Sequence, residues 1–291
     1  MLELKDVTKA YGSRRAIDGV SFQVPKGALT GFVGANGSGK TTTMRVVLGI
    51  AEADSGTVDW EGVAVDAAMR RRIGYMPEER GLYPRMSVRR QLVYLARLHG
   101  MAAAAAARRA GELLDRLDLG ERADDQVDAL SLGNQQRAQI AAALVHDPDL
   151  LLLDEPFSGL DPVAVDRLTA LLRELATAGV PVLFSSHQLE LVERLCDEVV
   201  ILAAGRVVAS GEVAALRRER GGGHLRLVVD GDAGWVRDLP GVRALDVDGP
   251  RALLDTDDPQ AVLAEAVRRG PVLEFAPVAP TLSELYREVL A

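Results

Sequence analysis

The stretch that decides the fold is Gly34-Ala35-Asn36-Gly37-Ser38-Gly39-Lys40-Thr41, which follows an apolar run at 28–33 and opens a helical pattern at 41–48. It fits the phosphate-binding loop pattern G-x-x-x-x-G-K-[ST], and this strand-to-helix context is the one the pattern requires. Glycines let successive backbone N–H groups point into one concavity, and the helix N-terminus adds its positive end. We therefore expect Lys40 to reach the β- and γ-phosphates of a nucleotide and Thr41 to offer its hydroxyl to magnesium. A simple glycine-rich turn is the alternative.

A second motif lies more than a hundred residues later, where the run Leu150–Leu153 ends in Asp154-Glu155. Four apolar residues in a row predict a strand that is buried on both faces. Carboxylates at the end of such a strand lie where open α/β sheets bind ligands. We expect Asp154 to hold magnesium, directly or through water, and Glu155 to orient and polarise the attacking water. A solvated acidic turn is the alternative, and the phosphate loop argues against it.

Residues 130–137 read LSLGNQQR and resemble the signature motif LSGGQ of ABC-type ATPases. The motif lies 154 − 131 = 23 residues before Asp154, in the order of that family. Leu132 replaces the first glycine and Asn134 replaces the final glutamine. The resemblance implies that Ser131 and Gly133 contact a γ-phosphate. Ser131 is also a good helix N-cap, and both interpretations can hold because a capped helix N-terminus is an anion site.

The same resemblance gives roles to four residues outside these motifs. Tyr11 resembles the aromatic residue that stacks on adenine, although a half-buried strand tyrosine is the alternative. Asp161 belongs to a loop that crosses to the partner subunit, and His187 resembles the switch histidine that contacts the γ-phosphate, although a lone histidine is usually structural. Glu78 stands where the family has a glutamine; a carboxylate can still bind magnesium, but it adds negative charge beside the phosphates.

The resemblance as a whole implies three sets of site residues. The nucleotide-binding set is Tyr11, Gly34, Asn36, Gly37, Ser38, Gly39, Lys40, Thr41, Thr42, Ser131, Gly133, Asn134 and Asp161. The magnesium set is Thr41, Glu78 and Asp154, and the catalytic set is Glu155, His187 and Lys40. The implied ligands are ATP and magnesium.

The expected fold class is α/β, because strands alternate with helical patterns along the chain. The resemblance implies a P-loop NTPase with a mostly parallel sheet core, an antiparallel β subdomain and a helical subdomain at about 85–145. Gly221-Gly222-Gly223 is the clearest linker candidate, and we expect an ATP-binding domain at 1–219 and a small α/β accessory domain at 220–291. The accessory domain resembles the extension of exporter-type ATPase subunits. It either regulates or dimerises the protein or serves as a packing appendage.

Composition limits the partners. The 291 residues carry 34 basic and 42 acidic side chains, a net charge of −8, which argues against nucleic acid as a partner. The single cysteine, Cys196, excludes an internal disulfide. The chain has neither an apolar run long enough to span a bilayer nor a signal pattern. We expect a cytoplasmic protein that is peripheral on the inner face of the cell membrane.

The resemblance implies a head-to-tail homodimer that encloses two ATP molecules, hydrolyses them and drives a separate multi-span permease. The run PEERGLYP at 77–84 resembles that of ATPase subunits of exporters for drugs and sodium ions, which favours export. An importer ATPase subunit is an alternative, because the form LSxGNQQ also resembles sugar importers. A soluble ABC-type ATPase acting on ribosomes or nucleic acid is another. A nucleotide sensor without hydrolysis is disfavoured by Glu155 and His187.

Overall fold

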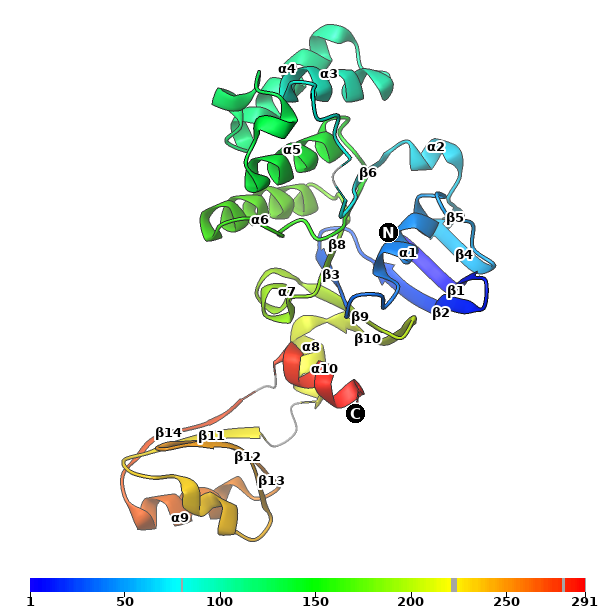
Figure 1. The fold of residues 1–291 in the computed structure, drawn as a ribbon. Coiled ribbons are helices and arrows are strands. Elements are labelled where there is room, and N and C mark those ends of the chain that lie inside the picture. Colours follow the sequence, from blue (N-terminus) through cyan, green and yellow to red (C-terminus); the bar gives the residue numbers. More distant parts are fainter. Residues whose placement is uncertain (80, 221–223, 279–280, 291) are drawn as a thin grey trace. The chain divides into compact units, whose positions relative to one another are not determined.

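The computed structural model describes residues 1–79, 81–220, 224–278 and 281–290. The chain divides into two compact units, Met1–Gly211 and Glu212–Ala291 (Figure 1). The division comes eight residues before the boundary expected at 219. The reason is helix α8 (Val213–Arg220), which contacts the last helix, α10 (Leu282–Leu290), within the second unit. The expected linker at 221–223 lies outside the described residues.

A six-stranded sheet with strand order β10-β9-β3-β8-β7-β6 forms the centre of the first unit. Its strands are β3 (Leu29–Val33), β6 (Ile73–Met76), β7 (Leu150–Leu153), β8 (Val182–Ser186), β9 (Glu198–Ala203) and β10 (Arg206–Glu212). The five strands from β9 to β6 pair in parallel. All four leucines of β7 are fully buried, as expected for a parallel strand covered on both faces. The predicted α/β class with a mostly parallel core is confirmed.

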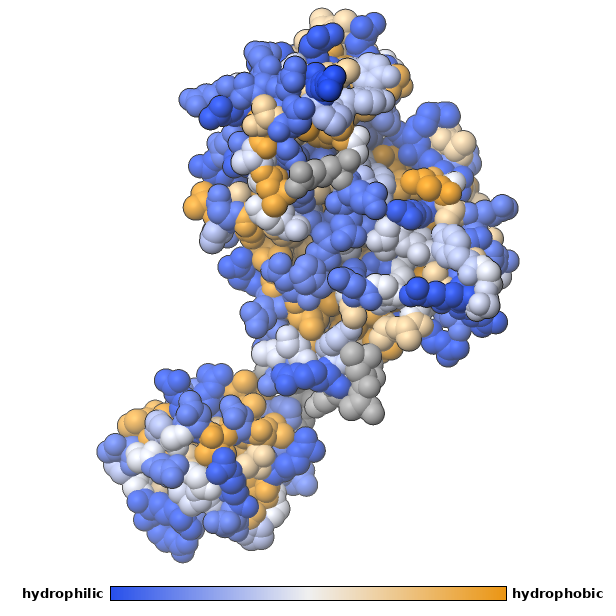
Figure 2. Space-filling model, in the orientation of Figure 1, coloured by the Kyte–Doolittle hydropathy of each residue, from blue (hydrophilic) through white to orange (hydrophobic). Residues whose placement is uncertain are grey.

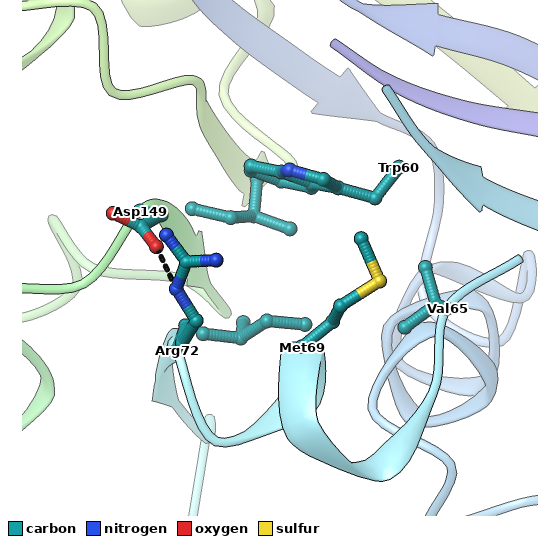
Figure 3. Close-up of a pocket in the computed structure, with 7 residues that line it drawn as sticks. Trp60, Val65, Met69, Arg72 and Asp149 are labelled. Carbon is teal, nitrogen blue, oxygen red and sulfur yellow. Dashed lines mark ion pairs between the residues drawn. The ribbon is translucent and has the colours of Figure 1, made fainter. Parts of the chain in front are cut away.

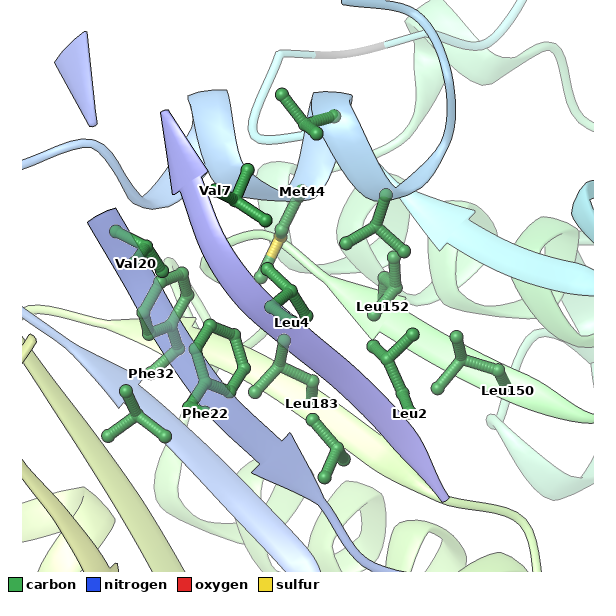
Figure 4. Close-up of a cluster of buried hydrophobic side chains, with 14 of the residues drawn as sticks. Leu2, Leu4, Val7, Val20, Phe22, Phe32, Met44, Leu150, Leu152 and Leu183 are labelled. Carbon is green, nitrogen blue, oxygen red and sulfur yellow. The ribbon is translucent and has the colours of Figure 1, made fainter. Parts of the chain in front are cut away.

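A second, antiparallel sheet has the order β2-β1-β4-β5. Its strands are β1 (Leu2–Tyr11), β2 (Arg14–Val24), β4 (Ser55–Trp60) and β5 (Val63–Ala64). Alternate residues of β1 and β2, including Leu2, Leu4 and Phe22, point into a cluster shared with the six-stranded sheet and helix α1 (Lys40–Val47) (Figure 4). Met44 of α1 is fully buried there. The cluster fixes the phosphate loop, because that loop joins β3 to α1.

Three helices form the predicted helical part: α3 (Val88–Leu98), α4 (Ala103–Arg116) and α5 (Leu132–Leu144). Helices α3 and α4 are separate, because Gly100 adopts a φ of +91° in the left-handed turn that commonly ends a helix. The other elements of this unit are helices α2 (Ala67–Arg70), α6 (Pro162–Thr177) and α7 (Leu189–Leu195) and the 3-10 turns η1 (Gly120–Arg122) and η2 (Val127–Ala129).

The second unit has its own sheet, with strand order β12-β13-β11-β14 and antiparallel pairing throughout. The strands are β11 (His224–Val229), β12 (Val242–Asp248), β13 (Arg251–Thr256) and β14 (Val272–Pro277). Turn η3 (Gly234–Asp238) and helix α9 (Pro259–Arg269) cover one face. Leu227, Leu254 and Val262 are buried between them, so this unit has a core of its own.

Hydrophilic residues predominate on the visible face of both units, interrupted by smaller hydrophobic areas (Figure 2). Within the described ranges, no helix combines the length and the apolar character that crossing a bilayer requires.

Candidate functional site

Three loops meet at one edge of the six-stranded sheet. Strands β3, β8 and β7 are parallel neighbours. Val33 and Ser186, the last residues of β3 and β8, pair with each other, and Leu153, the last residue of β7, pairs with Phe184, two residues before the end of β8. The loops that follow these strands therefore start side by side, as ligand-binding loops of open α/β sheets do. They carry the phosphate loop, the acidic pair and His187.

The phosphate loop is held in a conformation that needs glycine. Gly39 has a φ of +113°, and a Cβ atom there would lie 2.6 Å from the carbonyl oxygen of Ala16. A Cβ atom at Gly34 would lie 2.3 Å from the carbonyl oxygen of Leu202. Lys40 begins α1, and its Nζ donates hydrogen bonds to the carbonyl oxygens of Gly34 and Ala35 at 2.7 and 3.3 Å. The Lys40 ammonium group thus lies against the backbone carbonyl groups of the phosphate loop.

A chain of hydrogen bonds links the phosphate loop to the acidic pair. Thr41 Oγ1 donates to Asp154 Oδ2 at 2.7 Å. The other carboxylate oxygen of Asp154 accepts from Ser185 Oγ, and that same oxygen of Ser185 accepts from the backbone N–H of Glu155 at 2.8 Å. Asp154 is 1% exposed and Ser185 is fully buried, so the bond between these two side chains is shielded from water.

Glu155 occupies a conformation that is rare for a residue with a side chain. Its φ is +52°, in the left-handed region. Its side chain is only 12% exposed, and Oε2 lies 3.1 Å from Nδ1 of His187. Burial raises the pKa of the Glu155 carboxyl above its usual value, while the contact with His187 and the charge of Lys40 act in the opposite direction. The carboxylate is therefore more basic than an exposed one.

Lys40, Thr41, Asp154 and Glu155 border an open cavity of about 500 Å³, whereas Ser185 and His187 are not among the residues that line it. It is lined by Tyr11, Arg14, Ala16, Asn36, Gly37, Gly39, Lys40, Thr41, Thr42, Glu78, Asp154 and Glu155. The three carboxylates come from the loops after β6 and β7, and the lysine comes from α1. The Tyr11 ring is half exposed, with Lys9 Nζ 5.7 Å from its centre. A flat ring at the border of a polar cavity provides a surface on which a planar group can stack.

The donor atoms beside the phosphate loop suit magnesium. Mg²⁺ prefers oxygen ligands and is commonly bound through one or two carboxylates together with water and substrate phosphates. Thr41 and Asp154 provide a hydroxyl and a carboxylate at hydrogen-bond distance from each other, and Glu78 lines the same cavity. Among the described residues, no cluster of three or more histidine, cysteine or acidic side chains could hold a metal by itself.

Six of the expected nucleotide-binding residues do not line this cavity: Gly34 and Ser38, which belong to the phosphate loop itself, and Ser131, Gly133, Asn134 and Asp161. Two of them cap helices. Ser131 Oγ accepts from the N–H of Asn134 at 3.4 Å at the start of α5, and Asp161 Oδ1 accepts from the N–H of Ala164 at 2.8 Å at the start of α6. The N-cap interpretation of Ser131 is confirmed. Beside it, Leu132 is 50% exposed.

Sequence reasoning missed three residues at this site. Ser185 bridges the acidic pair, Gln136 donates to the carbonyl oxygens of Glu155 and Pro156, and Arg14 lines the cavity. A polar residue at the end of an otherwise apolar strand was the available signal for Ser185. Gln136 could not be found in this way, because its partners lie about twenty residues away in the chain.

Another hollow of the first unit is too small for a nucleotide (Figure 3). Trp60, Val65 and Met69 line it, and the ion pair of Arg72 with Asp149 lies beside it. Its volume of about 10 Å³ is near the minimum for a single water molecule. It is a packing defect between the two sheets and not a candidate site.

The phosphate loop follows one parallel strand, and the acidic pair follows another strand close to it in the same sheet. Together these two features define the class of this protein as a P-loop NTPase. Comparison with known proteins shows which families within this class match the chain. The family model for ABC transporter matches residues 17–158, and the model for ATP-binding protein DrrA1-3-like, C-terminal domain, matches residues 211–290.

Relatives extend the match over nearly the whole chain. The ABC transporter ATP-binding protein YhaQ of Bacillus subtilis strain 168 is 39% identical over 99% of this chain and 98% of its own length. Nod factor export ATP-binding protein I of Paraburkholderia xenovorans is 36% identical over 92% and 90%, respectively. Linearmycin resistance ATP-binding protein LnrL of B. subtilis strain 168 is 35% identical over 76% and 72%. A solved ATP-binding subunit of an ABC transporter superposes with a TM-score of 0.70 at 34% identity, over 76% of this chain and 93% of that one.

The chain belongs to the family of ABC transporter ATP-binding proteins, and it is an ABC-type ATPase with a DrrA-like C-terminal domain.

Proposed function

We propose that this protein is the ATP-hydrolysing subunit of an ABC-type export system. In this proposal it dimerises around two ATP molecules on the inner face of the cell membrane and drives a separate multi-span permease. The observation that carries the hydrolytic part is the hydrogen-bonded series Thr41, Asp154, Ser185 and Glu155 at the border of the 500 Å³ cavity. It joins the phosphate loop to a partly buried carboxylate of raised pKa.

The cavity binds ATP with its phosphates on the loop before α1. Backbone N–H groups between Gly34 and Gly39 donate to the phosphate oxygens, and the N-terminus of α1 favours their negative charge. Lys40 exchanges its two carbonyl partners for the β- and γ-phosphates. Asn36, Ser38 and Thr42 complete the loop's contacts, and the adenine stacks on Tyr11.

Thr41 and Asp154 hold magnesium, with Glu78 as a further oxygen ligand. When bound, the ion neutralises charge on the β- and γ-phosphates. The bond of Ser185 to the second oxygen of Asp154 keeps that carboxylate turned toward Thr41.

Glu155 accepts the proton of the attacking water. The water oxygen bonds to the γ-phosphorus while the bond from that phosphorus to the β–γ bridging oxygen breaks, which releases ADP and phosphate. The raised pKa makes Glu155 a better proton acceptor than an exposed carboxylate would be. His187, 3.1 Å from Glu155, fixes the direction of the carboxylate and contacts the γ-phosphate.

The dimer explains why Ser131, Gly133 and Asn134 lie away from the cavity of their own chain. Their backbone N–H groups stand at the start of the 13-residue helix α5, which favours an anion. A two-fold arrangement brings this end of α5, together with Asp161, to the ATP held by the other chain and forms two equivalent sites.

Export is supported by relatives and by the C-terminal domain. Two of the relatives are named Nod factor export ATP-binding protein I and linearmycin resistance ATP-binding protein LnrL, and residues 211–290 match the DrrA1-3-like domain. An importer subunit and a soluble ATPase that acts on ribosomes or nucleic acid are the competing functions.

The test is a pull-down of tagged Glu155→Gln protein with ATP from detergent-treated membranes of its own cell, analysed by mass spectrometry. If the proposal is right, the pull-down recovers a multi-span membrane protein without a solute-binding protein. The same pull-down with Lys40→Ala protein should not recover this partner. Recovery of a solute-binding protein would favour import. Ribosomal proteins or nucleic acid without a membrane protein would refute the transport role.

A further inference from the structure

Gln136 connects helix α5 to the residue that we place at the centre of hydrolysis. It is 8% exposed, and its Nε2 donates to the carbonyl oxygens of Glu155 and Pro156, each at 3.0 Å. A carboxamide has two N–H donors, so the two bonds use its full donor capacity. Both acceptors belong to the turn that follows β7.

The backbone of Glu155 is therefore held from both sides by buried side chains. Its N–H donates to Ser185 Oγ of β8 at 2.8 Å, and its carbonyl oxygen accepts from Gln136 of α5. A non-glycine residue at a φ of +52° persists only where its surroundings over-determine the conformation. These two contacts supply that restraint, and the conformation fixes the direction in which the Glu155 side chain leaves the backbone.

The first turn of α5 touches the same segment at a second point. A Cβ atom at Gly159 would lie 3.0 Å from Cδ2 of Leu132, so the leucine side chain covers this glycine closely. A Cβ atom at Gly133 would lie 3.3 Å from the carbonyl oxygen of Gly159. Helix α5 thus contacts the chain both at Glu155 and four residues beyond it.

We propose that Gln136 is a positioning residue for hydrolysis, which acts by holding the Glu155 backbone and so aiming its carboxylate at the attacking water. This inference rests on the proposed function of Glu155. It also gives α5 a second role, because the helix whose first turn we place against the partner's ATP is bonded directly to the catalytic turn of its own chain.

Gln135 offers a matched control. It is 9% exposed, and its Nε2 also donates to two carbonyl oxygens at 3.0 Å each. Its acceptors are Val127 and Leu130, so none of its amide bonds reaches the Glu155 segment. If the buried amides of α5 have a purely structural role, substitutions at Gln135 and Gln136 should lower kcat to a similar extent. If Gln136 positions Glu155, substitution of Gln136 should lower kcat more than substitution of Gln135.

The experiment compares Gln136→Met with Gln135→Met in the full chain, since methionine keeps the length of glutamine and removes its donors. Steady-state ATP hydrolysis gives kcat and KM, and thermal unfolding reports folding. We expect Gln136→Met to lower kcat by roughly 10- to 100-fold, as expected for a small misplacement of a reacting group, with KM for ATP within about twofold. Gln135→Met should keep kcat within about threefold of the unsubstituted protein. Gln136→Asn, which keeps the amide and shortens its reach, is the milder second variant, with a smaller loss of kcat.

A double-mutant cycle separates positioning from general damage. If Gln136 acts through the carboxylate, Gln136→Met should change the residual rate of Glu155→Gln by less than about twofold. Equal losses of kcat at Gln135 and Gln136, an unchanged kcat in Gln136→Met, or full additivity in the cycle would overturn the inference. If the unsubstituted protein hydrolyses no ATP, the proposed function itself fails, so the two failures are distinguishable.

Discussion

Nδ1 of His187 lies 3.1 Å from Oε2 of Glu155, across the gap between the ends of two neighbouring parallel strands. The contact lowers the pKa of Glu155 against the larger, opposite effect of burial, so the net shift is upward. Glu155 must be ionised to accept a proton, and hydrolysis should therefore decline on acidification at a pH above the usual glutamate pKa of 4.5.

Removing His187 should move this acid limb to still higher pH. In His187→Ala, burial of Glu155 persists while the contact that lowers its pKa is lost, so a larger fraction of the carboxyl is protonated at any given pH. The measurement is the pH profile of kcat/KM for ATP. Gln188→Ala changes the next, exposed residue and should leave the profile in place. An unmoved acid limb in His187→Ala would show that the contact does not tune Glu155.

Glu78 brings a third carboxylate to the cavity that Asp154 and Glu155 already line. Glu78→Gln removes a negative charge beside the phosphates and a good magnesium ligand. We expect KM for ATP to fall and the magnesium concentration for half-maximal activity to rise, each by about two- to fivefold. Titrations of activity against ATP and against Mg²⁺ measure both. Glu79→Gln is the matched control, since Glu79 does not line the cavity; similar changes in both variants would contradict a local role for Glu78.

His99 and His146 stack with their ring centres 3.8 Å apart and a 15° angle between the rings. Burial and the neighbouring His99 lower the pKa of His146 from 6.5 to about 4, although Asp149 acts in the opposite direction. At pH values between these two pKa values, His146 therefore binds a proton in the unfolded chain but not in the folded chain. Stability should fall as the pH falls from about 6.5 toward 4, by less than the roughly 3 kcal/mol that the full shift would give, because the ring is only partly buried and solvent screens the effect.

Denaturant unfolding of the first unit at several pH values across this window tests the effect. His146→Phe keeps a ring for stacking and cannot be protonated, so its free energy of unfolding should depend less on pH. His224→Gln, in the second unit, serves as the control. A pH dependence that is equal in the unsubstituted protein and in His146→Phe would rule out His146 as its source.

The sequence allowed prediction of those parts of the fold that local patterns determine. The run of leucines in β7 is buried on both faces, and Ser131 caps α5. Strand β6 and helix α2 escaped prediction because each has four residues, too few for a visible period, and neither is an unbroken run of leucines like β7. Strand β6 exists because β7 lies beside it in the sheet, which is a tertiary cause.

The site could be predicted only as far as its residues lie in contiguous motifs. The phosphate loop and the acidic pair are each one stretch of sequence, and the parallel sheet brings them together. Ser185 and Gln136 act through hydrogen bonds to a backbone segment distant in the chain, and no local pattern marks such a bond. The boundary between the two units lies at Gly211 and not at the position expected from the sequence, because α8 contacts α10 and so belongs to the second unit. No local sequence pattern marks that contact.

The most direct test of the account is the behaviour of Glu155→Gln protein with ATP and magnesium. Light scattering gives the molar mass with and without ATP, and phosphate release gives the rate. If the proposed function is right, ATP doubles the mass from that of a single 31.1 kDa chain, while hydrolysis falls on the order of 100-fold or more. A variant that hydrolyses ATP at the unsubstituted rate, or that keeps the mass of one chain in saturating ATP, would contradict it.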